Sequence, residues 1–167
     1  MFNRIVIILI ITGFIYAKDE QKVVLITGTA YGIGKSTAEL LIDKGHIVYG
    51  GDILVEENLY LNDIGGTALE MDVTNQEHID KAINQIISEQ GRVDVLVNNA
   101  GLGVYGAIED VSMEDIYYQY DVNLFGLARV TKAVLPYMRE KESGLIINIS
   151  SVSVSYTHLT LPTNLSV

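Results

Sequence analysis

A glycine-spaced stretch at residues 27–34 constrains the fold of this chain more than any other feature of its sequence. The apolar run before it, at 23–26, is typical of a strand that is covered on both faces. The residues after it, 33–44, favour a helix that ends at Gly45, a residue suited to a left-handed C′ position. A strand, a tight turn and a helix in this order begin a βαβ unit. We therefore expect an α/β fold built on a parallel sheet.

Strand and helix signals continue to alternate after this unit. A helix is expected to open with a capping box, in which Thr74 accepts from the N3 amide and Glu77 reaches back, and to end at Gly91. A longer helix is expected over about 112–138, with capping contacts from Ser112 and Asp115. The sequence has no internal repeat or dividing linker, so we expect one domain. The remaining strands are expected at residues 47–49, 67–71, 93–97 and 145–149.

Composition restricts the classes of function. The chain has 167 residues, of which 49% are hydrophobic and 19% charged, and this balance is typical of a globular protein. Its net charge of −10 disfavours a nucleic-acid surface, which needs an excess of Lys and Arg. The absence of cysteine excludes thiolate metal sites and Cys nucleophiles. The histidines are scattered, and we expect no metal site: His46, His78 and His158.

The N-terminus carries an apolar segment at residues 5–17, preceded by Arg4. It is short for a membrane span, which needs about 20 residues, but it suits a signal-peptide core that ends at Ala17. An additional strand and a misassigned start are the alternatives. We expect residues 1–21 to be a signal or anchor segment. A cytoplasmic or membrane-associated protein and an exported form both fit this expectation.

The C-terminal residues from Val154 onward have neither helical nor strand periodicity. They resemble the translation of a transposase-type sequencing adapter, and a genuine polar tail is the alternative. We therefore treat 154–167 as a non-native tail and 22–153 as the core domain.

The glycines of the 27–34 loop have distinct expected roles. Gly28 permits the tight turn, Gly32 lets the backbone approach a pyrophosphate, and Gly34 lets the helix pack closely on the strand. Free amides and the helix dipole then stabilise the anion without a basic side chain. A glycine-rich turn with no ligand is the alternative. We expect the loop to bind the cofactor phosphates, with Tyr31 and Ile33 also in contact.

The spacing Gly-x-x-x-Gly-x-Gly resembles that of the short-chain dehydrogenase/reductase family, and three further segments follow in the family's order. Asp72-Val73 matches the family's adenine-contacting aspartate and its neighbour. Asn98-Asn99-Ala100-Gly101 is similar to the motif that lines the cofactor site and braces the sheet. Asn123 matches the helix-borne active-site asparagine. The resemblance covers about 22–153 and implies a Rossmann-like, doubly wound parallel sheet in three α/β/α layers, incomplete at the C-terminal side.

The end of the second strand indicates which cofactor is preferred. Asp52 follows Gly34 at the distance typical of an acidic residue that accepts from the adenosine ribose hydroxyls and repels a 2′-phosphate. A solvated loop carboxylate is the alternative. Relatives that prefer NADP place Arg or Lys nearby, where this chain has Tyr31, Gly51 and Ile53. We therefore predict NAD over NADP.

The resemblance also assigns catalytic residues for hydride transfer to or from a CH–OH group. It implies that Ser151 orients the substrate and that Asn123 positions a proton-relay water. Alternatively, Ser151 only ends the fifth strand through local side-chain hydrogen bonds. The family's tyrosine would fall at Asn164 and its lysine beyond the last residue, while Tyr156 is too close to serve. The chain as written therefore lacks its general acid, and we expect it to be poorly soluble and without turnover.

These features lead to one main hypothesis, an NAD-dependent oxidoreductase acting on a small-molecule alcohol or ketone. The amino-acid sequence around 101–109 and 123–126 is most similar to hydroxysteroid-dehydrogenase-like members of the family. A non-catalytic nicotinamide-binding module and an inactive fragment are the alternatives. The family resemblance implies a homo-oligomer for the full-length form, and a tyrosine cluster on the long helix suits either core or interface: Tyr117, Tyr118 and Tyr120.

Overall fold

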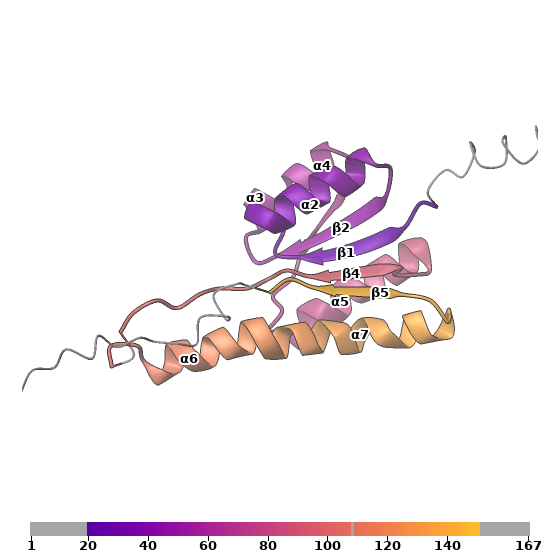
Figure 1. Cartoon of the computed structure of the whole chain (residues 1–167). Coiled ribbons are helices and arrows are strands. Elements are labelled where there is room, and N and C mark those ends of the chain that lie inside the picture. Colours follow the sequence, from indigo (N-terminus) through magenta and orange to yellow (C-terminus); the bar gives the residue numbers. More distant parts are fainter. Residues whose placement is uncertain (1–19, 108, 151–167) are drawn as a thin grey trace, which may run out of the picture.

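The computed structural model describes residues 20–107 and 109–150. Its strands form one parallel sheet in the order β3-β2-β1-β4-β5, as expected for a doubly wound α/β fold (Figure 1). The segment at 5–17, Ser151 and the tail at 154–167 lie outside the described residues. The strands are β1 (Val23–Thr27), β2 (Ile47–Asp52), β3 (Thr67–Glu70), β4 (Val95–Asn98) and β5 (Leu145–Asn148).

Helices cover both faces of the sheet. Figure 1 shows α2 (Gly32–Asp43), α3 (Val55–Asn58) and α4 (Tyr60–Asp63) over one face. The other face carries α5 (Gln76–Gln90) and α7 (Leu127–Glu140). Within 20–107 and 109–150, no helix has the length and apolar character needed to cross a membrane.

The core consists of two apolar layers, one on each face of the sheet, and β1 contributes to both. Val23 and Leu25 belong to the layer under α5 and α7, while Val24 and Ile26 belong to the layer under α2. This alternation follows from the two-residue period of a strand. All five residues of β1 are buried, which confirms the prediction of a strand covered on both faces.

The helix α5 begins one residue later than predicted. Asn75, and not Thr74, is its N-cap, since Asn75 Oδ1 accepts from the amides of Glu77 (2.9 Å) and His78 (3.4 Å). The predicted capping box was wrong because the Thr74 hydroxyl donates to Asp72 Oδ1 (2.7 Å) instead. The end of the helix is as predicted, with Gly91 in the left-handed conformation.

The predicted continuous helix over 112–138 is interrupted. Ser112 caps α6 (Met113–Tyr120), as expected, but a π-helix, η1 (Asp121–Gly126), separates α6 from α7. Gly126 lies against Val73, and a Cβ at this position would be 2.6 Å from Val73 Cγ2. Such π segments occur frequently at functional sites. Here the π segment contains Asn123.

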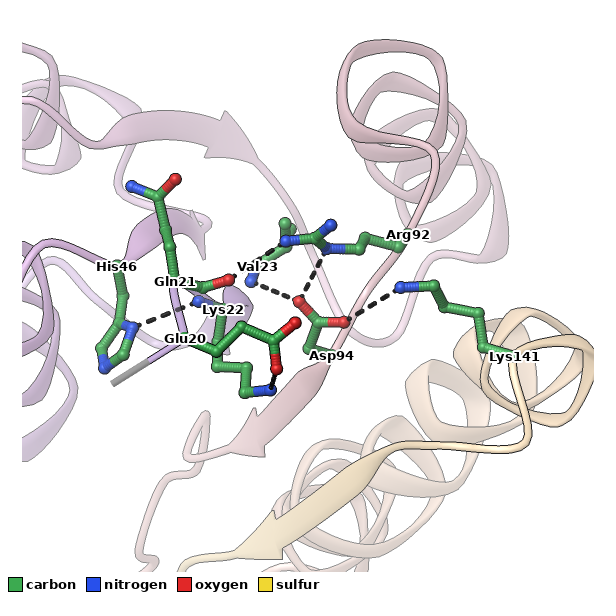
Figure 2. A network of polar contacts seen from close by, with 8 residues as sticks. All are labelled: Glu20, Gln21, Lys22, Val23, His46, Arg92, Asp94 and Lys141. Atoms are coloured by element: carbon green, nitrogen blue, oxygen red, sulfur yellow. Dashed lines mark hydrogen bonds and ion pairs between the residues drawn. The ribbon is translucent and has the colours of Figure 1, made fainter. Parts of the chain in front are cut away.

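Polar contacts around Asp94 hold together the amino-terminal ends of β1 and β4 (Figure 2). Asp94 Oδ2 accepts from Val23 N (2.8 Å) and from Arg92 Nε (2.9 Å), and Lys141 Nζ lies 3.5 Å from Oδ1. Burial raises the pKa of Asp94, but the Val23 hydrogen bond and the charges of Arg92 and Lys141 outweigh it and lower that pKa below its ordinary value. This network lies at the opposite end of the strands from the glycine loop.

Candidate cofactor-binding site

A cleft of about 400 Å³ lies at the carboxyl ends of the strands. It is located where the strand order reverses between β1 and β4, which is the usual ligand position in an open α/β sheet. The loops after β1, β2, β3 and β4 contribute to it, together with α6 and η1. The lining residues are Gly28, Tyr31, Ile33, Asp52, Ile53, Leu54, Met71, Asp72, Asn99, Ala100, Gly101, Leu102, Tyr118 and Val122.

Gly28 and Gly34 take the backbone roles expected of them, in the tight turn and in the close packing of α2. Gly28 has φ +74°, and a Cβ there would lie 2.8 Å from Ala100 Cα. A Cβ at Gly34 would collide with the carbonyl oxygen of Gly28, so only glycine lets α2 pack this closely. Gly32 has φ +59°, and its missing Cβ would meet nothing within 4 Å in the described part of the chain. The loop therefore presents open backbone beside the cleft.

The N-terminus of α2 fits an anionic group. Among the described residues, no side chain caps this helix, whose N-cap is Tyr31, and its first turn has no acidic residue. In contrast, Asn75 caps α5 and Glu77 lies in its first turn. Uncapped amides and the helix dipole attract a phosphate. The residues present therefore suit the pyrophosphate of a dinucleotide.

Thr27 and Asn99 join the loops that follow β1 and β4. Thr27 Oγ1 accepts from the amides of Asn99 and Ala100, both at 3.0 Å. Asn99 Nδ2 donates to the carbonyls of Thr27 (3.0 Å) and Gly28 (2.9 Å). Asn99 was not among the predicted site residues, although its place in the Asn-Asn-Ala-Gly segment was a signal for it. Through these hydrogen bonds, Asn99 holds the loop after β4 against the start of the glycine loop.

Asp52 ends β2 at the cleft, as predicted. Its Oδ2 accepts from the amide of Ala30 (2.8 Å) and its Oδ1 accepts from the amide of Leu54 (2.9 Å). Each carboxylate oxygen can accept more than one hydrogen bond. The side chain is therefore held in place while it retains accepting capacity toward the cleft.

The other residues predicted for the cofactor site divide into two groups. Asp72 lines the cleft, and its Oδ1 is held by the amide (2.8 Å) and hydroxyl (2.7 Å) of Thr74. Val73 is buried in the core and does not line the cleft. Asn98 is also buried away from the lining, where its Nδ2 donates to Asn148 Oδ1 (2.9 Å) and Thr131 Oγ1 (3.1 Å). Asn98 therefore braces β4 against β5 and α7.

Asn123 projects from η1 to the loop that follows β4. Its Oδ1 accepts from the amide of Leu102 (2.9 Å) and its Nδ2 donates to the carbonyl of the same residue (2.7 Å). Leu102 and Val122, its neighbours in space and in sequence, both line the cleft. The structure therefore places Asn123 at the edge of the site.

The sequence profile of the short chain dehydrogenase family matches residues 22–162. The chain is 48% identical over 134 residues to a 3-ketodihydrosphingosine reductase of Bacteroides thetaiotaomicron, a match that covers 80% of this chain and 48% of that protein. It is 39% identical over 140 residues to a 3-oxoacyl-(acyl-carrier-protein) reductase of Thermotoga maritima, a match that covers 80% of this chain and 56% of that protein. The chain thus spans about half the length of these curated relatives.

Solved structures give the same result. A 3-ketoacyl-(acyl-carrier-protein) reductase from Brucella melitensis, complexed with NADH, superposes with a TM-score of 0.76 at 30% identity and covers 79% of this chain and 57% of its own. A short-chain dehydrogenase from Streptomyces avermitilis superposes with a TM-score of 0.73 at 38% identity, covering 79% and 50%. This chain belongs to the short-chain dehydrogenase family.

Proposed function

We propose that this chain forms the NAD-binding part of an oxidoreductase that acts on the CH–OH group of a small alcohol or on the corresponding ketone. One observation carries the proposal. The backbone amide of Ala30, in the glycine loop, donates a 2.8 Å hydrogen bond to Asp52 at the cleft. Family membership and the NADH complex of the Brucella melitensis protein support it. When bound, the nicotinamide would supply the hydride acceptor or donor.

The preference for NAD is proposed from the charge of the cleft. Asp52 and Asp72 contribute carboxylates, and among the described residues that line the cleft none is Lys or Arg. Ribose hydroxyls can donate to Asp52, whereas a 2′-phosphate would meet its negative charge without a basic partner.

The substrate end of the site is proposed from the family resemblance. Asn123 would orient a water for proton transfer and Ser151 would hold the substrate oxygen. Two of the relatives are named as ketone reductases, which supports a ketone or a secondary alcohol as substrate. The resemblance to hydroxysteroid dehydrogenases stays a prediction, as does membrane association through residues 5–17.

A homo-oligomer is proposed from the exposed aromatic surface of α6 and η1. Tyr117 is 67% exposed, Tyr120 53% and Phe125 52%. These large, exposed side chains follow one another along two consecutive helical segments, and exposed aromatic residues are typical of interfaces. This distribution favours an interface role for Tyr117 and Tyr120 over a core role.

The cofactor site can be tested with one substitution made at both ends of α2. Gly32 and Gly45 both have positive φ, and both have open space around the position of a Cβ within the described residues. Gly32→Asp places a carboxylate where the pyrophosphate is proposed to bind, and Gly45→Asp imposes the same strain and charge at the far end. In NADH fluorescence titrations, Gly32→Asp should weaken binding by about tenfold or more, because like charges repel.

Gly45→Asp should keep the wild-type affinity. No NADH binding by the folded wild-type chain, or an equal loss in both variants, would contradict the proposed cofactor site.

A further inference from the structure

Thr29, in the middle of the glycine loop, is fully buried and is held by the segment between β2 and β3. Its side chain is 0% exposed, and its Oγ1 donates a 2.8 Å hydrogen bond to Oδ1 of Asn58, the last residue of α3. Its carbonyl oxygen accepts a 3.0 Å hydrogen bond from the hydroxyl of Tyr60, the first residue of α4. One external segment therefore holds both the side chain and the main chain of this loop residue.

Asn58 is itself anchored to the sheet. It is 1% exposed, and its Nδ2 donates to the carbonyls of Gly50 (2.8 Å) and Leu69 (3.4 Å), which belong to β2 and β3. A buried amide is costly unless its polar atoms are hydrogen-bonded, and here both of them are. Asn58 therefore links the glycine loop to β2 and β3 through hydrogen bonds on both of its polar atoms.

The contact has little freedom to shift. A Cβ at Gly50 would lie 2.5 Å from Thr29 Oγ1, so β2 approaches the threonine as closely as glycine allows. Burial, and then the charges of Glu39 and Asp52, raise the pKa of Tyr60 to about 12, so its hydroxyl stays protonated and able to donate well into alkaline solution. Lys35 Nζ lies 4.2 Å from the centre of the Tyr60 ring, which further restrains this side chain.

We propose that Asn58 and Tyr60 are positioning residues that fix the glycine loop through Thr29, and so determine the affinity for the pyrophosphate of the cofactor. The inference rests on the proposed NAD site. Asp52, at the adenosine end, belongs to β2 and accepts from the amides of Leu54 and Ala30, so only one of its two hydrogen bonds comes from the glycine loop. Loss of the Thr29 contacts should therefore weaken binding of the pyrophosphate more than binding of the adenosine.

The test uses variants that remove one hydroxyl each and keep the shape of the side chain. Thr29→Val removes the donor to Asn58, and Tyr60→Phe removes the donor to the Thr29 carbonyl. Thr29→Ser keeps the hydroxyl. Asn62→Leu is a matched control, since Asn62 lies on α4 and accepts from Ala68 N (2.9 Å) without contacting the loop. Affinities for NADH and for adenosine are measured by calorimetry, and folding is checked by circular dichroism.

Thr29→Val and Tyr60→Phe should each weaken NADH binding by about fivefold, the value of one hydrogen bond, while adenosine binding changes by less than about twofold. Thr29→Ser and Asn62→Leu should keep the wild-type affinity for NADH. If wild-type chain binds no NADH, the proposed function fails and this inference with it. If the wild-type chain binds NADH and both Thr29→Val and Tyr60→Phe keep the wild-type affinity, only the positioning role is overturned. The same holds if the variants lose affinity for NADH and for adenosine by the same factor.

Discussion

The backbone amide of Ala30 donates a 2.8 Å hydrogen bond to Oδ2 of Asp52, so the glycine loop and the end of β2 share a direct contact. The two residues lie in different βα connections, and the parallel pairing of β1 with β2 brings them together. Asp52 is therefore both a part of the loop's support and a fixed negative charge in the cleft. Its two roles can be separated by substitution.

Asp52→Asn should relax the preference for NAD. The amide side chain keeps the shape but has one accepting oxygen, so one of the two backbone amides loses its acceptor, and the charge that opposes a 2′-phosphate is removed. We expect the ratio of NADPH to NADH dissociation constants to fall by about tenfold or more, as measured by fluorescence titration. Asp52→Ala should relax the ratio too, with weaker binding of both cofactors, because the Ala30 and Leu54 amides lose their acceptor.

Asp63→Ala is the charge-matched control, because Asp63 is exposed on α4 and does not line the cleft. An unchanged ratio in both Asp52 variants would defeat the assignment of cofactor preference to this carboxylate.

The features of the site that the sequence predicted are local in the chain. Gly28 and Asp52 lie at strand ends and Gly34 lies in the first turn of α2, where residue type and spacing determine the backbone. The contacts that the sequence did not predict, such as those of Asn99 and Asn58, join segments that are distant in the chain. Their partners depend on strand order and on which side chains become buried, and one-dimensional patterns do not contain this information.

Helix boundaries show the same division. The predicted helix at 33–44 was confirmed within a residue because Gly45 marks its end. The short helices α3 and α4 were not predicted, since four residues give no measurable periodicity. The π-helix was not predicted, and its last residue, Gly126, packs against Val73, a tertiary contact that sequence periodicity does not contain.

Asn75→Ala should destabilise the fold by about 1 kcal/mol, the usual loss when a side-chain N-cap is removed. Asn75 Oδ1 accepts from two amides at the start of α5, and alanine leaves both without that acceptor. Asn75→Ser should retain most of the stability, since serine is an equally good N-cap. Urea unfolding measures the difference, and equal stability of the alanine and serine variants would show that the cap contributes little.

Asp94→Asn should destabilise the fold by about 1–3 kcal/mol at pH 7, because the half-buried carboxylate accepts from Val23 and Arg92 and pairs with Lys141. The folded-state pKa of Asp94 is lowered, so its contribution is fully present above the unfolded pKa of about 4. As pH falls through the folded pKa, the wild-type protein should lose this advantage.

Urea unfolding at a series of pH values should therefore show the two proteins converging in acid. Glu20→Gln is the control, because Glu20 forms an exposed pair with Lys22 and should not change stability measurably. A gap between wild type and Asp94→Asn that stays constant from pH 7 to pH 3 would show that charge is not the cause.

Tyr117→Glu should weaken self-association if α6 and η1 form the subunit interface. Tyr117 is 67% exposed on α6, and a carboxylate at a desolvated contact is costly. Tyr105→Glu makes the same change at a residue that is 92% exposed in the loop after β4. Sedimentation velocity should show a shift toward monomer for Tyr117→Glu alone. A monomeric wild type, or equal dissociation of both variants, would place the interface elsewhere.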